Sequence, residues 1–79
     1  MKYVYVLQSK MTPERYYVGC TSDLKRRMID HNAGLSPHTK KYAPWLLTSY
    51  IAFANHAKAD QFEAYLKTGS GRAFSKRHL

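Results

Sequence analysis

The chain has 79 residues, which is the length of a single domain with a thin hydrophobic core. Hydrophobic residues make up 44% of it and aromatic residues 14%, and this composition excludes an intrinsically disordered chain. Thirteen Lys and Arg residues against five Asp and Glu residues give a formal net charge of +8, which favours a nucleic acid as partner over a purely structural or protein-binding role.

The chain is predicted to begin with a β-hairpin. Residues 2–8 are β-branched and aromatic, and they predict a strand that is buried on both faces. Residues 15–20 predict a second strand, and Pro13 lies in the short polar connection, which favours antiparallel pairing.

The N-terminal apolar run is too short for a signal peptide, and no segment approaches the length of a membrane span. We therefore expect a soluble, cytoplasmic protein.

A helix is predicted to follow the hairpin. Thr21 and Ser22 offer capping hydroxyls, and Asp23 puts a negative charge in the first turn. The helix is expected to continue to about Asn32, with Gly34 available just past its end. A basic loop then leads to a third predicted strand, residues 45–53.

The last third of the chain is predicted to be helical. Asn55 is the expected cap of a helix from about residue 57 to residue 68, and Gly69 and Gly71 are expected to end it. Residues 72–79 predict a short basic helix.

The element order β-β-α-β-α-α predicts one α+β domain over residues 1–79. Its three-stranded antiparallel sheet should have the first strand in the centre and helices against its faces.

Several residues in the first half of the chain are candidates for chemistry. Tyr5 and Tyr17 can face the same side of the hairpin at close range, although simple packing is an alternative. Gly19 indicates a bulge or the close approach of another backbone, with a bend before the first helix as the alternative. Arg27 and His31 are spaced i, i+4 on one helix face, where an arginine can present a fork of donors to a phosphate or be a solvated charge.

Glu63 is the most informative of the five acids. It borders an apolar helical stripe formed by Ala59, Phe62 and Leu66. An ion pair with a nearby Lys or Arg is one explanation, and a ligand for Mg²⁺ is the other. The single cysteine, Cys20, excludes an internal disulfide and a zinc site built from several cysteines.

Together these residues resemble the GIY-YIG nuclease superfamily, in particular the small stand-alone bacterial group related to the N-terminal nuclease domain of the excision-repair subunit UvrC. Tyr3-Val4-Tyr5 is similar to the first motif of that family, without its glycine and isoleucine, and Tyr17-Val18-Gly19 is similar to the second. Residues 20–34, 40–45 and 63–74 resemble its later segments. The asparagine that some members carry after the acid is missing here, and His38 is a candidate substitute.

The resemblance implies a metal-dependent DNA endonuclease, with a role in DNA repair or processing. Glu63 would hold one Mg²⁺ or Mn²⁺ ion, and Tyr17, with Tyr5 close by, would help to deprotonate the attacking water. Arg27 would stabilise charge on the phosphate, and His31 would position or relay a proton. Phosphate contacts are expected from Lys40, Lys41, Arg72, Lys76 and Arg77.

Two further expectations follow from that assignment. A partner protein would help so small a domain to choose its target. The tyrosines, Arg27 and Glu63 should converge on one accessible pocket. The alternative function is a nucleic-acid-binding module of the same fold without useful catalysis.

Overall fold

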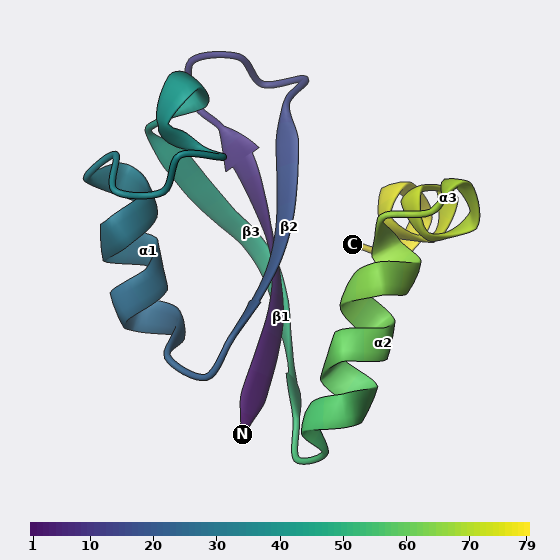
Figure 1. Ribbon diagram of the computed structural model, residues 1–79. Helices are drawn as coiled ribbons and strands as arrows, with labels where there is room; N and C mark the ends of the chain where they lie inside the picture. The colour runs from purple at the N-terminus through teal and green to yellow at the C-terminus, as the bar shows by residue number, and fades with distance from the viewer.

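The computed structural model describes residues 1–79, which form one sheet and three α-helices (Figure 1). In chain order the elements are β1 (Lys2–Ser9), β2 (Tyr16–Thr21), α1 (Leu24–Asn32), a 3₁₀ turn η1 (Lys40–Tyr42), β3 (Trp45–Phe53), α2 (His56–Leu66) and α3 (Gly69–His78).

The sheet has the strand order β2-β1-β3, and both pairs are antiparallel. The predicted α+β architecture with the first strand in the centre is confirmed. Residues Val4 to Leu7 of β1 are all buried, because helices cover both faces of this central strand. In the register, Tyr5 lies opposite Gly19 on one side and opposite Tyr50 on the other.

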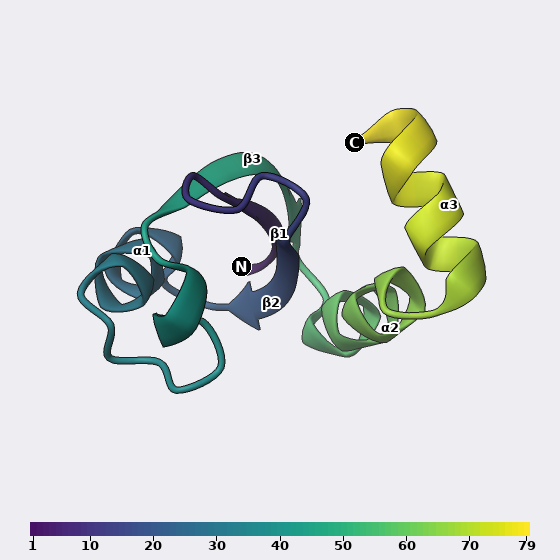
Figure 2. The same ribbon diagram turned by 90° about the horizontal axis from the view of Figure 1, so that it is seen from above.

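The helices lie on opposite faces of the sheet (Figures 1 and 2). Alternation along β1 therefore divides the core in two. Tyr5 and Leu7 pack with Trp45 beneath α1, whereas Val4 and Val6 pack with residues of α2. None of the helices is long and apolar enough to cross a membrane.

The start of α1 differs from the prediction. Its N-cap is Asp23, whose side chain accepts a hydrogen bond of 3.0 Å from the Arg26 amide, so Thr21 and Ser22 do not cap the helix. The Thr21 hydroxyl instead accepts the amide of Asp23 at 3.1 Å and fixes the turn before the helix. The predicted glycine past the other end is confirmed, since Gly34 has a φ of 74°.

The junction of α2 and α3 also corrects the prediction. Asn55 caps α2 as expected, but the helix ends at Leu66, and Gly69 and Gly71 are the first and third residues of α3 rather than terminators of α2. Thr68 caps α3 by accepting the Gly71 amide at 3.1 Å. A side chain at Gly71 would collide with the backbone of Tyr65 and Leu66, so glycine allows the corner to be tight.

Candidate functional site

A buried hydrogen-bonded chain links β1, α1 and the loop before η1. The Tyr5 hydroxyl lies 2.8 Å from Nε2 of His31, and Nδ1 of His31 lies 2.7 Å from Oγ1 of Thr39. All three residues are almost completely buried. If the Tyr5 O–H donates to Nε2, the neutral imidazole keeps its proton on Nδ1 and donates it to Thr39.

Gly19 makes room for this chain. The Tyr5 side chain leans over the edge strand β2, and its hydroxyl occupies the space that a Cβ atom on Gly19 would need. The close approach expected at this glycine was that of another backbone, and the structure instead places the Tyr5 side chain there.

Tyr17 lies beside these hydrogen-bonded side chains, on the same face of the sheet as Tyr5. Its ring centroid is 6.5 Å from that of Tyr5 and 5.3 Å from that of His31. Tyr17 is half-buried, whereas Tyr5 is fully enclosed. Of the two hydroxyl-bearing rings, Tyr17 is therefore the one that is accessible to a substrate.

Two opposite charges act on the Tyr5 hydroxyl. Burial raises the pKa of Tyr5 well above its usual value of 10, and Tyr17 raises it further. The Arg27 guanidinium lowers the pKa of Tyr5, and the Glu63 carboxylate raises it. The pKa of His31 is lowered, mainly by burial and then by Arg27, with Asp30 opposing. Tyr5 thus stays protonated and His31 stays neutral near pH 7.

Glu63 lies on α2, and α2 covers the opposite face of the sheet from α1, the helix that carries Arg27 (Figure 1). The Tyr17 ring lies beside His31 of α1. Arg27 and Glu63 thus reach the site from opposite sides, and the charges of both act on the Tyr5 hydroxyl.

The two faces of the sheet meet at the edge strand β2. Tyr5 leans over Gly19 on one face. The next residue, Cys20, has its thiol within 4.8 Å of a Glu63 carboxylate oxygen on the other face. Gly19 and Cys20 are successive residues of a strand, so they face opposite sides of the sheet.

The Glu63 carboxylate has both of the environments considered from the sequence. It forms an ion pair with Lys67, at 3.2 Å, and it also belongs to a group of potential metal ligands with Asp60 and Cys20. Carboxylate oxygens of Asp60 and Glu63 are the type of donor that Mg²⁺ prefers, so this donor set fits the expected ion.

Asp60 and Cys20 were not among the predicted site residues. The i, i+3 spacing of Asp60 and Glu63 on a helix was the available signal. His38 is exposed on the loop before η1 and does not belong to this group of ligands.

A basic groove runs beside Tyr17 on the α2 and α3 side of the hairpin. Its volume is about 930 Å³, and one acid, Glu14, lies among its lining residues. The cationic side chains that line it are Arg15, Lys67, Arg72 and Lys76.

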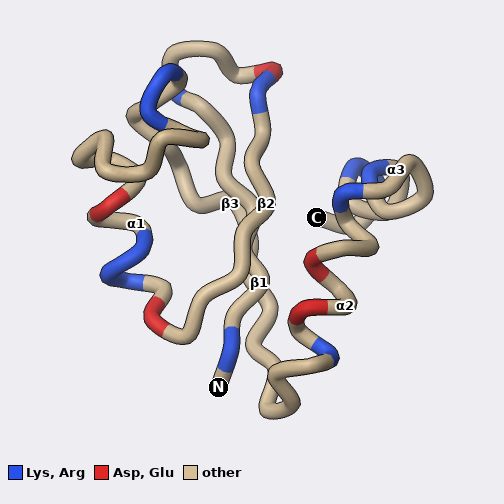
Figure 3. Tube along the Cα trace, viewed as in Figure 1, with Lys and Arg blue, Asp and Glu red and all other residues tan.

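Two of the predicted phosphate contacts, Arg72 and Lys76, therefore share this groove with Tyr17. Lys40 and Lys41 are exposed on η1, and Arg77 is exposed near the end of α3 outside the groove lining. Figure 3 shows Lys and Arg positions along α1 and along α3, on both sides of the sheet.

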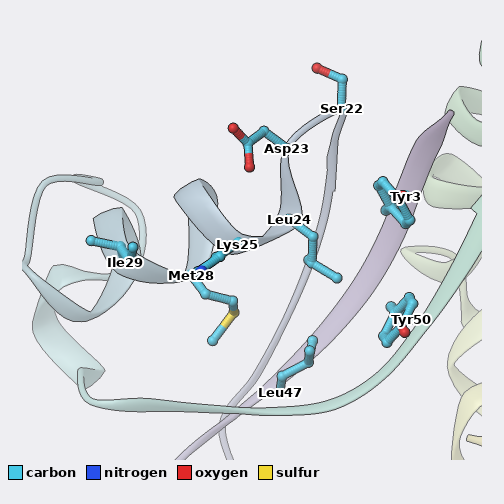
Figure 4. Close-up of a pocket in the computed structure, with 9 residues that line it drawn as sticks. All are labelled: Tyr3, Ser22, Asp23, Leu24, Lys25, Met28, Ile29, Leu47 and Tyr50. Atoms are coloured by element: carbon cyan, nitrogen blue, oxygen red, sulfur yellow. The ribbon is translucent and has the colours of Figure 1, made fainter.

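A second, mostly apolar hollow of about 700 Å³ lies between α1 and the sheet (Figure 4). Leu24, Met28 and Ile29 of α1 face Leu47 and Tyr50 of β3 across it. It contains none of the predicted site residues.

The family model described as the GIY-YIG catalytic domain matches residues 1–77. The chain is 35% identical to a UPF0213 protein of Clostridium perfringens over 85% of its own length and 71% of that protein, and 36% identical to one from Streptococcus pneumoniae over 82% and 65%.

It is also 36% identical to the structure-specific endonuclease subunit SLX1 of Candida dubliniensis, over 96% of this chain but only 28% of that protein. The chain thus spans little more than a quarter of that longer relative. The chain belongs to the GIY-YIG catalytic domain family, with relatives among small stand-alone bacterial proteins.

Proposed function

We propose that this protein is a metal-dependent endonuclease that hydrolyses DNA phosphodiester bonds. The observation that carries the proposal is the cluster of Tyr5, Tyr17 and His31, whose central hydroxyl is acted on by the charges of both Arg27 and Glu63. A tyrosine, a guanidinium and a carboxylate supply the proton acceptor, the cation and the metal ligand that phosphodiester hydrolysis requires. Family membership supports the same activity.

Tyr17 is the proposed proton acceptor for the attacking water. Its ring is the more accessible of the two and lies beside Tyr5 and His31 on the α1 face. The residue also borders the basic groove on the other side of the edge strand. A phenol is a poor base near pH 7, so a positive charge close by is needed to favour its ionised form. Arg27 is the proposed source of that charge within the protein.

Tyr5 and His31 have a supporting role in this proposal. Because the pKa of Tyr5 is raised, its hydroxyl stays protonated, and it is hydrogen-bonded to Nε2 of His31. The Thr39 hydroxyl is hydrogen-bonded to the other ring nitrogen. The buried chain keeps the rings at fixed positions beside Tyr17. Arg27, exposed on α1, would stabilise the negative charge that develops on the phosphate.

Glu63, with Asp60 one turn before it, is the proposed ligand for Mg²⁺ or Mn²⁺. When bound there, the ion would supply a Lewis acid for the phosphate oxygens. The ammonium groups of Lys2 and Lys67, which now neutralise these carboxylates, would turn toward the DNA or the solvent.

Phosphates of the DNA are proposed to contact the cations of the basic groove together with Lys40, Lys41 and Arg77. We further propose that the protein acts in the cytoplasm, in DNA repair or processing, with a partner protein that chooses the target. SLX1 of Candida dubliniensis is named as a subunit, which is consistent with a partner.

One observation favours the alternative of a binding module without catalysis. Lys2 and Lys67 already pair with Asp60 and Glu63, so the carboxylates are satisfied without a metal ion. In that case the basic surface would bind DNA and leave it intact.

The test is a panel of plasmid, single-stranded, flapped and branched DNA, incubated with purified protein in Mg²⁺, in Mn²⁺ and in chelator. Cleavage of at least one substrate with metal and none with chelator is the expected result. Salt-dependent binding to all of them without any cleavage would reject the endonuclease and leave the binding module.

A further inference from the structure

Cys20 lies in a cluster of three potential metal ligands that come from two separate elements. The Cys20 Sγ atom on β2 and carboxylate oxygens of Asp60 and Glu63 on α2 all lie within 4.8 Å of one another. The Sγ atom is 3.8 Å from Oδ1 of Asp60. Ligands bound at about 2.0–2.3 Å from one tetrahedral ion lie roughly 3.3–3.8 Å apart, so small side-chain rotations would bring the three into contact with one cation.

This cluster already attracts a positive charge. The Lys2 ammonium group lies 2.6 Å from Oδ1 of Asp60. The pKa of Lys2 is raised, first by this hydrogen bond to Asp60, and the charges of Asp60, Cys20 and Glu63 all act in the same direction. The Asp60 side chain is 58% exposed, so an ion can enter from solvent and displace the lysine.

The three donors do not suit all cations equally. Mg²⁺ prefers oxygen and would use only the two carboxylates. Zn²⁺ and Co²⁺ are softer and bind thiolate sulfur well, so they gain a ligand that Mg²⁺ does not use.

We propose that Cys20, Asp60 and Glu63 form a binding site for a thiophilic divalent cation, such as Zn²⁺ or Co²⁺, that competes with Mg²⁺ for Glu63. On binding, the Cys20 thiol gives its proton to solvent and its sulfur bonds to the ion, with no change of oxidation state. Only the competition with Mg²⁺ rests on the proposed endonuclease function. The binding itself does not.

A titration of the DNA-free protein with Co²⁺ tests the site directly. One equivalent should produce a near-ultraviolet thiolate-to-cobalt charge-transfer band, and Zn²⁺ should remove it, whereas Mg²⁺ at the same concentration should not. Cys20→Ser should abolish the band. Because Cys20 is the only cysteine, a wild-type protein without this band would overturn the proposal.

The carboxylate ligands are tested by the same titration. Asp60→Asn and Glu63→Gln should each weaken Co²⁺ binding by at least roughly tenfold. Removing a residue that only supports a metal ligand already costs about that much affinity, and these two residues are proposed as direct ligands. Glu14→Gln, which changes an exposed acid outside the cluster, is the control and should bind Co²⁺ like the wild type. Equal affinities in all four proteins would overturn the three-ligand site.

Lys2→Met gives a prediction of opposite sign. It removes the ammonium group that competes for Asp60, so Co²⁺ should bind more tightly than to the wild type. Weaker binding in a variant that is folded by circular dichroism would contradict the proposed competition.

The link to DNA cleavage is measured separately. Zn²⁺ added to a reaction with Mg²⁺ should inhibit the wild type more than Cys20→Ser, each compared with itself without Zn²⁺. A charge-transfer band without cleavage under any condition would reject the endonuclease and keep the metal site. Cleavage with Mg²⁺ but no band would do the reverse.

Discussion

Gly19 lies on the edge strand between the two sides of the candidate site. It has no side chain, so the Tyr5 ring can lean over the edge strand and reach His31. The next residue, Cys20, faces the other side of the sheet, where its side chain lies close to Asp60 and Glu63. The role of Gly19 is steric and does not depend on an unusual backbone angle, since the only glycine with positive φ is Gly34.

Gly19→Ala should therefore be damaging although it adds one methyl group. The new Cβ collides with the Tyr5 hydroxyl and ring, and such overpacking costs about 1–3 kcal/mol. Urea unfolding should show this loss, and DNA cleavage should fall with it because the Tyr5–His31 hydrogen bond is displaced. Unchanged stability and cleavage would mean that the Tyr5 ring is not held over Gly19.

His31 predicts how stability depends on pH. Its pKa is lowered in the folded protein, so below about pH 6.5 the unfolded chain takes up a proton that the folded chain resists. Stability should thus be full above that pH and fall as the pH drops from 7 to 5, by at most about 1.4 kcal/mol per pH unit for one proton.

Urea midpoints at pH 7 and pH 5 measure this fall. His31→Gln should flatten the dependence, whereas His38→Gln, which changes an exposed histidine, should keep it. A dependence that is equally steep in His31→Gln would assign it to other groups.

At the scale of elements, the corner between α2 and α3 depends on one of two neighbouring glycines. Gly71 packs against the backbone of Tyr65 and Leu66, whereas a Cβ atom on Gly69 would meet nothing within 4 Å. Gly71→Ala should therefore destabilise the protein by at least about 1–3 kcal/mol because backbone atoms cannot move aside easily. Gly69→Ala should cause no comparable loss. Thermal unfolding of the two variants tests this, and equal effects would contradict the packing described at the corner.

The sequence was sufficient for the elements and insufficient for their ends. Hydrophobic patterning predicted the three strands, the central position of the first strand and the helical segments, because burial on one or two faces is a local property of the pattern. The α2–α3 corner was mispredicted because glycine usually ends a helix, and here tertiary contact with Tyr65 determines its position. At α1, three adjacent residues could all cap, and only the backbone geometry selects Asp23.

The site shows the same limit. Tyr5, Tyr17 and His31 were found from strand and helix spacing together with family resemblance, and they do lie together. Asp60 and Cys20 were missed because their proximity depends on how α2 packs across β2, which no local pattern encodes. For the same reason the sequence did not predict that Glu63 and Arg27 lie on opposite faces of the sheet.

At the scale of the whole molecule, the net charge of +8 predicts binding to DNA that weakens steeply with salt. Replacing both Arg72 and Lys76 by alanine should lower the slope of log affinity against log salt by about 2, because each phosphate contact contributes roughly 1. Lys25→Ala, on the α1 side of the sheet, should change the slope much less. Fluorescence anisotropy at several salt concentrations measures these slopes, and an unchanged slope in the double variant would remove the groove from the DNA-binding surface.

The opposed helices give the molecule its proposed division of work. In the proposed function, Tyr5, Tyr17, His31 and Arg27 would handle protons and phosphate charge from the α1 face. Glu63 and Asp60 would hold the metal from the α2 face. The edge strand lies between them, so a DNA strand that crosses this edge would contact both sets.

The most direct test of this account compares DNA cleavage by the wild type and by Glu63→Gln in Mg²⁺, together with DNA binding in chelator. Loss of a metal ligand should reduce cleavage by at least about 100-fold and leave DNA binding nearly intact. This figure is the upper end of the loss seen when a residue that only supports a metal ligand is removed. Gln61→Ala, on the exposed side of the same helix, should cleave like the wild type. Equal cleavage by Glu63→Gln and the wild type would contradict the account.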